Sequence, residues 1–305
     1  MTVGMKPSAA VVVDSTLVRM LLDEQHPDLT ELALDEVGGG WDNQLYRLGP
    51  TLAVRLPRRE VAASLVRHEH QWLPVLAPSL PLPIPVPIRI GVPGCGYPWY
   101  WTVVPWLDGT PGVETVTDAT ALARDLGAFL CALHRPASPA APSNPWRGVP
   151  LRQRAPALVD GLTRIDGDGV DTHAIRRAWD RLVQAPPWAG VPLWIHGDLH
   201  PDNLLLRGGR LSSVLDFGDL TAGDPATDLA VAWMACSAST RSTFRDAARN
   251  ADSPIDEDTW TRAQGWALAL GVAYLAQSRG DARLRALGLG TIKAVLGEVS
   301  ESTRL

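Results

Sequence analysis

Three side chains that carry oxygen ligands follow one another closely in the second half of the chain. Asp198 and Asn203 lie in WIHGDLHPDNLLL, and Asp216 begins DFGD after the apolar SSVL. The apolar runs predict short strands, so the three side chains are expected together at one end of a small sheet. Phosphoryl transfer needs a carboxylate that orients or deprotonates a hydroxyl, together with oxygen ligands for Mg²⁺. The spacing therefore favours phosphoryl transfer.

A metal-dependent hydrolase is the alternative for the same stretch. His196, Asp198 and His200 alternate and could share one metal ion. A hydrolytic zinc site would need a further group of ligands upstream, and the other histidines form none. This alternative explains less of the pattern, and His68 and His70 are instead expected on the surface of a helix.

Two earlier segments suit nucleotide binding. Gly38, Gly39 and Gly40 precede Asn43 between two expected strands. A glycine run alone also fits a hairpin turn, but ahead of the polar stretch its bare N–H groups could approach phosphates closely. The second segment is AVRLPR, a strand whose charged residue is Arg55.

The elements that must position these residues fall into two kinds. The first hundred residues predict a meander of strands and little helix, whereas the rest is mainly helical. The expected elements are a helix at 14–25, a β-meander at 32–58, a helix at 60–73 that stops at Pro74, an extended proline-rich run at 80–95, a buried strand at 97–107, a helix at 118–134 and strands within 192–217. The proline-rich segment 136–150 is interpreted as a connector without chemistry.

The two polar motifs resemble a known family. HGDLHPDNLL and DFGD are similar to the catalytic loop and DFG element of protein kinases, and most of all to those of the aminoglycoside phosphotransferase family. The resemblance implies an α+β, protein-kinase-like fold of two lobes. A small antiparallel sheet lobe for the nucleotide would span 1–107, and a larger, mainly helical lobe for catalysis and substrate would span 108–305.

The resemblance also implies roles for single residues. Asp198 would be the catalytic base, and Asn203 and Asp216 would hold Mg²⁺. His196 would brace the catalytic loop. Two aspartates in GDPATDLA would cap a helix and brace the same loop, namely Asp224 and Asp228.

For the nucleotide, the resemblance points to the N-terminal part. Arg55 stands where kinases have a lysine, and GWDNQLYRLG and AVRLPR look like arginine-bearing members of the family; Glu69 is the expected partner of Arg55. The hinge that would contact the purine through its backbone is Pro105, Trp106 and Leu107. The implied cofactors are Mg²⁺ and ATP or GTP.

The acceptor is less narrowly defined. The family phosphorylates hydroxyls of small molecules, and the expected acceptor is an antibiotic, an aminoglycoside first and a macrolide second. Carboxylates at 160, 166, 168 and 171 and at 252 and 256–258 could receive a polycation, whereas Trp233, Trp260 and Trp266 could form an apolar wall. The alternatives are a kinase for choline, homoserine or a sugar, and a nucleotide-binding pseudokinase suggested by Arg55.

Composition restricts the remaining classes. A net charge of −5, from 28 basic and 33 acidic residues, offers no footprint for nucleic acid. Asp14 and Arg19 interrupt the apolar Val11–Val13 run, so neither a signal peptide nor a membrane partner is expected. The scattered cysteines Cys95, Cys131 and Cys236 suit a reducing compartment, which predicts a cytoplasmic protein of undetermined oligomeric state.

Overall fold

The computed structural model describes residues 10–39, 42–113, 116–165, 169–249 and 255–301. The chain divides into two compact units. Of the described residues, the N-terminal unit takes those up to Thr110 together with Ser212–Gly218, and the C-terminal unit takes Pro111–Leu211 and those from Asp219 on. Ser212–Gly218 carries Asp216, so this residue belongs with the N-terminal sheet although its position in the sequence is late.

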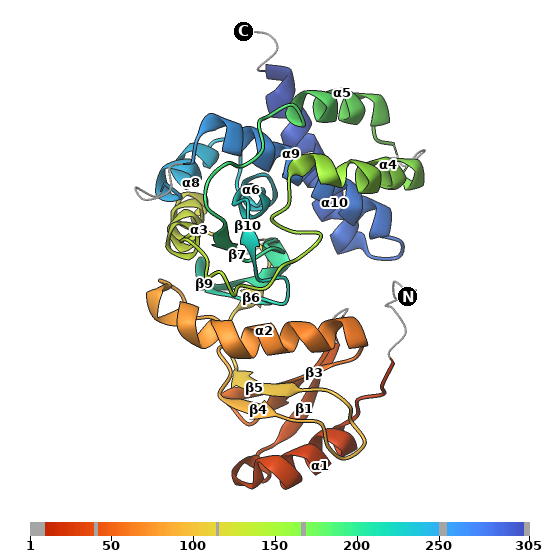
Figure 1. Ribbon diagram of the computed structural model, residues 1–305, viewed down its shortest axis with the longest axis vertical. Helices are drawn as coiled ribbons and strands as arrows, with labels where there is room; N and C mark the ends of the chain where they lie inside the picture. Colours follow the sequence, from red (N-terminus) through yellow and green to blue (C-terminus); the bar gives the residue numbers. More distant parts are fainter. Residues whose placement is uncertain (1–9, 40–41, 114–115, 166–168, 250–254, 302–305) are drawn as a thin grey trace. The chain divides into compact units, whose positions relative to one another are not determined.

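The N-terminal unit is built on one antiparallel sheet with the strand order β1-β2-β3-β5-β4 (Figure 1). Its strands are β1 (Leu34–Gly39), β2 (Asn43–Leu48), β3 (Leu52–Pro57), β4 (Arg89–Gly91) and β5 (Trp101–Pro105). The first three strands form the expected meander, since β2 pairs with β1 on one side and with β3 on the other. The predicted N-terminal sheet is therefore confirmed.

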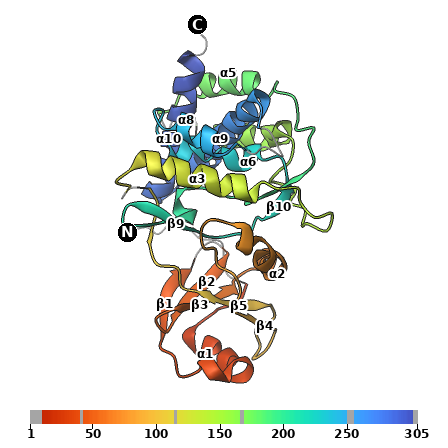
Figure 2. The ribbon, with the colours of Figure 1, turned by 90° about the vertical axis from the view of Figure 1, so that its left-hand side faces the viewer.

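Helix α1 (Ser15–Gln25) covers one face of this sheet. Asp14 caps it by accepting a hydrogen bond from the N–H of Leu17, and Leu21 and Leu22 are fully buried. Alternate strand residues such as Val54 and Leu56 meet them in one apolar core. Both ribbon views place α1 and helix α2 (Glu60–Leu76) on opposite sides of the sheet (Figure 2). Arg55, between Val54 and Leu56, points to the other face, where it contacts Glu69 on α2.

Helix α2 (Glu60–Leu76) is longer than its sequence predicts. Pro74 lies inside its last turn instead of ending it. A proline this close to a helix end removes only one internal hydrogen bond, and the N–H of Ala77 still reaches the carbonyl of Leu73. The expectation that the helix stops at Pro74 is wrong by one short turn.

The C-terminal unit is mainly helical, as predicted. Helix α9 (Glu257–Gln277) lies among the others and buries residues on all its faces (Figure 1). The helices packed against it are α10 (Ala282–Glu301), α6 (Ala226–Leu229), α4 (Ala155–Arg164) and α5 (Thr172–Leu182). The helices are α3 (Ala119–Leu133), α4 (Ala155–Arg164), α5 (Thr172–Leu182), α6 (Ala226–Leu229), α7 (Ala232–Ala235), α8 (Arg241–Ala247), α9 and α10 (Ala282–Glu301). Short 3₁₀ turns complete the chain at Pro27–Leu29, Ala77–Ser79, Leu151–Arg154 and Pro201–Asn203.

Short strands frame the polar stretch around Asp198. Strand β7 (Leu193–Ile195) enters it and pairs antiparallel with β10 (Thr221–Gly223). Strand β8 (Leu204–Arg207) leaves it and lies between β6 (Thr110–Pro111) and β9 (Arg210–Val214). Across the described ranges, no helix is long and apolar enough to cross a lipid bilayer.

Candidate active site

Arg55 on β3 lies between two carboxylates of the N-terminal unit. Its Nη1 is 3.1 Å from Oε1 and 3.2 Å from Oε2 of Glu69 on α2, and its Nη2 is 3.6 Å from Oδ1 of Asp216. Burial by itself disfavours the charge, but the two carboxylates outweigh it and raise the pKa of Arg55. The guanidinium thus joins the strand, the helix and the DFGD segment with a permanent positive charge.

Asp216 combines an unusual backbone with an open side chain. Its φ of 59° lies in the left-handed region, which aspartate tolerates better than most residues. Its side chain is 56% exposed although it faces Arg55. The carboxylate is therefore held at one oxygen and open to a ligand.

Gly38 and Gly39 of the glycine run end β1, which contains a β-bulge between Glu36 and Gly38. Gly38 has a φ of 124° at the point where the β1–β2 register shifts, a conformation that favours glycine. A Cβ on Gly39 would lie 2.6 Å from Oε1 of Gln44, and Gly40 falls outside the described residues. Asn43 begins β2, and its buried Oδ1 has no hydrogen-bond partner among the residues described. The described residues on either side of 40–41 thus combine glycine backbone with one orphaned polar atom.

The expected hinge ends β5. Pro105 pairs with Leu52, and the N–H of Trp106 donates to the carbonyl of Thr51 at 2.7 Å. Arg47 stacks over the Trp106 ring at 4.7 Å. The Trp106 N–H is therefore committed to the protein, which leaves Leu107 as the remaining expected donor.

In the C-terminal unit, Asp228 holds the backbone of the loop that leads to Asp198. Its carboxylate accepts from the N–H of His196 at 2.7 Å and of Gly197 at 2.9 Å. Nε2 of His134 lies 3.1 Å from the same carboxylate. Asp228, His134 and His196 are all deeply buried. Gly197 has a φ of 88°, and a Cβ there would collide with the backbone of Asp219. The sharp turn before Asp198 thus depends on glycine and on a buried carboxylate.

Asp198 and Asn203 meet across this loop. The Asn203 side-chain amide donates to the backbone carbonyl of Asp198 at 2.8 Å, and the Asp198 N–H donates to Nδ1 of His196 at 3.3 Å. Burial alone would raise the pKa of the Asp198 carboxyl, but attraction to Arg147, His200 and His196 outweighs it and holds that pKa below its usual value. Asp198 is therefore an ionised carboxylate at neutral pH.

Asp224 is buried and bound to Arg262 and to the start of α6. It accepts two hydrogen bonds from the guanidinium of Arg262, at 2.7 Å and 3.3 Å, and both side chains are 3% exposed. It also accepts from the N–H of Ala226 at the start of α6. Asp224 thus anchors α9 to the segment that follows DFGD.

The sequence pattern missed Arg147 and Asn144, which lie in the supposed connector 136–150. Arg147 Nη2 donates to Oδ1 of Asp198 at 2.7 Å, and its Nε donates to Oδ2 of Asp219 at 3.1 Å. Asn144 donates to the other oxygen of Asp219 at 2.8 Å. The segment expected to be a connector thus contacts Asp198 and Asp219 through polar side chains, and the signal for this in the sequence is a polar pair among prolines.

Tyr274 on α9 was also missed. Its ring packs edge-on to that of His200, with centroids 5.8 Å apart. Burial, reinforced by the negative charge of Asp198, raises the pKa of its hydroxyl. That hydroxyl is buried without a hydrogen-bond partner in the described part of the chain, so it is a polar atom that a ligand could satisfy.

The expected site residues therefore form two groups. The N-terminal unit brings together Arg55, Glu69 and Asp216, and the C-terminal unit brings together Asp198, Asn203, His196 and Asp228. Within the described ranges, no three His, Cys, Asp or Glu side chains gather as they would around a shared metal ion. The alternating His196, Asp198 and His200 do not make such a cluster.

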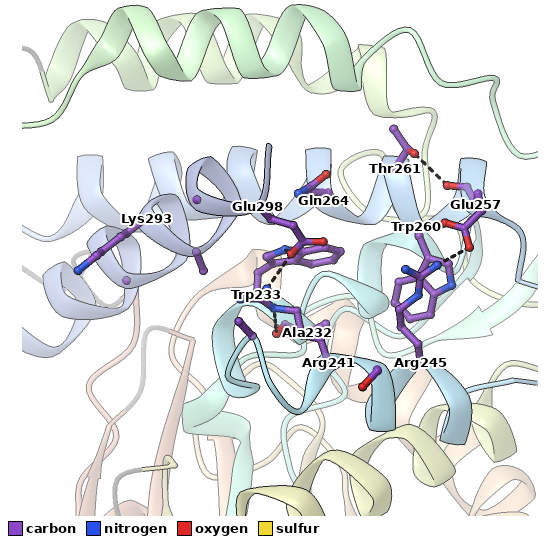
Figure 3. A pocket seen from close by; sticks show the side chains of 15 residues that line it. Ala232, Trp233, Arg241, Arg245, Glu257, Trp260, Thr261, Gln264, Lys293 and Glu298 are labelled. Atoms are coloured by element: carbon purple, nitrogen blue, oxygen red, sulfur yellow. Dashed lines mark hydrogen bonds and ion pairs between the residues drawn. The ribbon is translucent and has the colours of Figure 1, made fainter. Parts of the chain in front are cut away.

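A cavity of about 770 Å³ opens among α7, α8, α9 and α10 (Figure 3). Trp233 and Trp260 line it, with Arg241 stacked over the first ring at 5.8 Å and Arg245 over the second at 4.8 Å. Trp266 is fully buried, so the expectation that it lines a pocket is wrong. The last residue of α9 that lines the cavity is Gln264. At 1.5 Å per helical residue, it lies about 15 Å along the helix axis from Tyr274.

Four of the carboxylates expected to receive a polycation have other partners. Asp160 pairs with Arg164, and Glu257 with Arg245 at 2.5 Å. Asp171 and Asp256 cap α5 and α9. The members at 166, 168 and 252 lie outside the described residues. Asp160, Asp171, Asp256 and Glu257 are thus engaged locally, whereas Asp258 is exposed in the first turn of α9.

Solved structures share this fold. The GDP complex of wild-type aminoglycoside 2'-phosphotransferase-IIIa superposes with a TM-score of 0.68 at 20% identity, covering 94% of this chain and all of that one. The apoenzyme of macrolide 2'-phosphotransferase MphH from Brachybacterium faecium gives a TM-score of 0.61 at 22% identity, covering 92% of this chain and 98% of that one.

Sequence comparison gives the family. The uncharacterized protein YcbJ of Bacillus subtilis (strain 168) is 36% identical over 76 residues, and the match spans only 24% of each chain. The model of the phosphotransferase enzyme family matches residues 34–266, which include both groups of site residues. With that match over most of its length, and with the fold of the antibiotic kinases, the chain belongs to the phosphotransferase enzyme family.

Proposed function

We propose that this phosphotransferase moves the γ-phosphate of ATP or GTP to a hydroxyl of a small molecule, with Mg²⁺ as cofactor. The observation that carries the proposal is Asp198, an ionised carboxylate in a loop whose backbone is fixed by Asp228. A general base must be ionised, within reach of the proton and held in place. Asp198 meets the first and last of these requirements in the structure.

Asp198 would accept the proton of the attacking hydroxyl. Its Oδ1 is engaged by Arg147, whereas its Oδ2 lies 3.7 Å from Nε2 of His200, beyond hydrogen-bond distance. Oδ2 is therefore the oxygen left for the acceptor. The orphaned hydroxyl of Tyr274 is a second group that the acceptor could satisfy.

Asn203 and Asp216 suit Mg²⁺, which prefers oxygen ligands. Because the nitrogen of the Asn203 amide is committed to the carbonyl of Asp198, its oxygen remains as a ligand atom. Asp216 offers an exposed carboxylate. When bound there, Mg²⁺ would neutralise charge on the phosphate oxygens.

The N-terminal unit would bind the nucleotide. Arg55, fixed by Glu69, would face the phosphates together with the N–H groups of Gly38 and Gly39. Leu107 would contact the purine. The solved relative aminoglycoside 2'-phosphotransferase-IIIa is a GDP complex, which supports a nucleotide in this fold.

We further propose a hydroxyl-bearing antibiotic as acceptor, because the solved structures of similar fold include aminoglycoside and macrolide phosphotransferases. Aminoglycosides remain the first class to test. Macrolides stay beside them because Asp160 and Glu257, two of the acidic residues expected to receive a polycation, are paired with arginines.

The test is transfer itself. Purified protein is incubated with Mg²⁺, with ATP or GTP, and with aminoglycosides, macrolides, choline, homoserine or sugars, and the phosphorylated acceptor is measured by mass spectrometry. Transfer to an antibiotic that stops with excess EDTA is the expected result. Transfer only to a metabolite would replace the acceptor class, and nucleotide binding without any transfer would contradict the proposal in favour of a pseudokinase.

A further inference from the structure

The segment that carries Arg147 has no regular structure but is firmly attached within the C-terminal unit. The hydroxyl of Thr221 donates to the carbonyl of Pro142 at 2.7 Å, and the N–H of Gly148 donates to the hydroxyl of Thr227 at 3.1 Å. The N–H of Asp224 donates back to the carbonyl of Gly148 at 3.0 Å. The main chain is therefore anchored at both ends of this segment.

Close packing at Gly148 strengthens this attachment. Its φ is 67°, and a Cβ there would lie 2.9 Å from Cδ1 of Ile195 on β7 and 3.0 Å from Cα of Gly223 on β10. Only glycine fits such a position without a shift of the backbone. Because Gly148 is tightly packed, the backbone of Arg147 beside it is held in place.

The guanidinium then bridges two carboxylates. Arg147 reaches Asp198 through Nη2 and Asp219 through Nε, and the second oxygen of Asp219 is taken by Asn144. Asn144 is itself oriented, since its Oδ1 accepts from the N–H of Trp146 at 2.8 Å. Arginine suits this arrangement because its donors form a rigid fork.

Exposure separates this bridge from a purely structural ion pair. Arg147 is 16% exposed, whereas Asp198 and Asp219 are 31% and 28% exposed. In the pair of Arg262 and Asp224, both side chains are 3% exposed. Arg147 thus approaches its carboxylates from the protein side and leaves part of each open.

We propose that Arg147, supported by Asn144, is the positioning residue that orients the Asp198 carboxylate so that its Oδ2 faces the acceptor hydroxyl. The inference rests on the proposed function of Asp198. Arg147 could instead block the site and have to move away before each turnover. The anchored main chain argues against such a movement. A displacement of about 1 Å in a reacting group can lower the rate by about 100-fold, so orientation of this carboxylate has a measurable value.

The test compares variants at this position. Arg147→Ala is expected to lower kcat by about 30- to 100-fold while the KM for nucleotide stays within about twofold. Arg147→Lys should recover part of the loss, because an ammonium can reach one carboxylate but cannot bridge both. Arg152→Ala removes an exposed arginine of the neighbouring turn and serves as the matched control, with kcat unchanged.

Chemical rescue separates positioning from folding. Millimolar guanidinium should raise kcat of Arg147→Ala several-fold and leave Arg152→Ala unchanged. If Arg147→Ala does not fold, Asn144→Ala, which removes the contact to Asp219 and the hydrogen bond from the Trp146 N–H but leaves Arg147 in place, should lower kcat by about 3- to 10-fold with an unchanged melting temperature. A folded Arg147→Ala enzyme with wild-type kcat, or a loss without rescue that follows only the folded fraction, would overturn the inference.

A second readout keeps the two proposals distinguishable. Slow transfer of phosphate to water needs no acceptor and should fall in Arg147→Ala as well. If the wild-type protein transfers phosphate to water and Arg147→Ala does so at the same rate, the positioning role alone is overturned. Absence of transfer to any acceptor and to water in the wild-type protein would overturn the proposed function and, with it, this inference.

Discussion

Each unit contains an arginine that bridges two carboxylates. In the N-terminal unit, Arg55 joins Glu69 and Asp216, and in the C-terminal unit, Arg147 joins Asp198 and Asp219. The first arginine comes from a regular strand, and the second from a segment without regular structure. The difference shows that a fixed guanidinium requires an anchored main chain, which a strand or a network of loop hydrogen bonds can supply equally well.

The largest expected effect concerns the carboxylate that Arg147 holds. Asp198→Asn keeps the shape and the hydrogen bond to Arg147 but removes the base, so kcat should fall by about 10²- to 10⁴-fold. Nucleotide affinity and melting temperature should stay close to wild type. The measurement is the initial rate of acceptor phosphorylation.

Asp202→Asn is the matched control for this prediction. Asp202 lies in the same loop and pairs with Arg283 at 2.8 Å, so its amide variant should change kcat by less than about threefold. Equal losses in both variants would show that the loop tolerates no change in charge, and the assignment of Asp198 as base would lose its support.

A third arginine sharpens the comparison by stabilising the fold without an open carboxylate. Arg262→Met would leave Asp224 buried without its charged partner, and unfolding of the C-terminal unit should become easier by about 3–5 kcal/mol. Urea denaturation followed by tryptophan fluorescence measures the change. The exposed pair of Arg164 with Asp160 gives the control, because Arg164→Met should cost less than about 1 kcal/mol. A loss below 1 kcal/mol in Arg262→Met would refute the contrast.

A smaller effect is expected at Arg55. In Arg55→Lys, the ammonium can contact Glu69 but cannot also approach Asp216 as a planar fork, so the KM for nucleotide should rise about 3- to 10-fold. Steady-state kinetics with varied ATP and GTP would show it, with the exposed Arg89→Lys as control. An unchanged KM would mean that bridging by Arg55 has no consequence for the nucleotide.

The smallest expected effect concerns the pKa of His70, which the charge of Arg55 helps to lower. His70 is half-buried and lies 2.6 Å from the hydroxyl of Thr102, so the expectation of a surface histidine is wrong. Burial first, then Arg55 and Arg67, lowers the pKa of His70 from 6.5 to about 4. As the pH falls from 6.5 to about 4, the unfolded chain therefore binds a proton at this position before the folded protein does. The free energy of unfolding decreases over that pH range.

His70→Gln keeps a donor near Thr102 and removes the titration. Between pH 7 and 4, the variant should lose about 1 kcal/mol less stability than the wild-type protein, a value reduced for the partial exposure of the ring. Urea denaturation across this range measures the difference, and the exposed His173→Gln should follow the wild-type curve. Parallel curves for all three proteins would contradict the predicted titration.

How far the sequence predicts this molecule depends on the range of each signal. Alternation in β3 and helical spacing in α3 are local, and they predict the sheet and the main helices correctly. HGDLHPDN and DFGD identify the family because the motif residues are close in sequence. Arg147 lies 51 residues before Asp198, and only the folded chain brings the two together. His70 and Trp266 were misjudged for the same reason, since tertiary packing determines their burial.

The most direct test of the account measures both arginines against the same two quantities. The dissociation constant for MgATP, from calorimetry, and kcat, from acceptor phosphorylation, are determined for Arg55→Met and Arg147→Met. The account predicts that Arg55→Met raises the dissociation constant at least about tenfold, whereas Arg147→Met leaves it within about twofold and lowers kcat by about 30-fold or more. Equal loss of nucleotide affinity in both variants, or unchanged affinity in Arg55→Met, would contradict it.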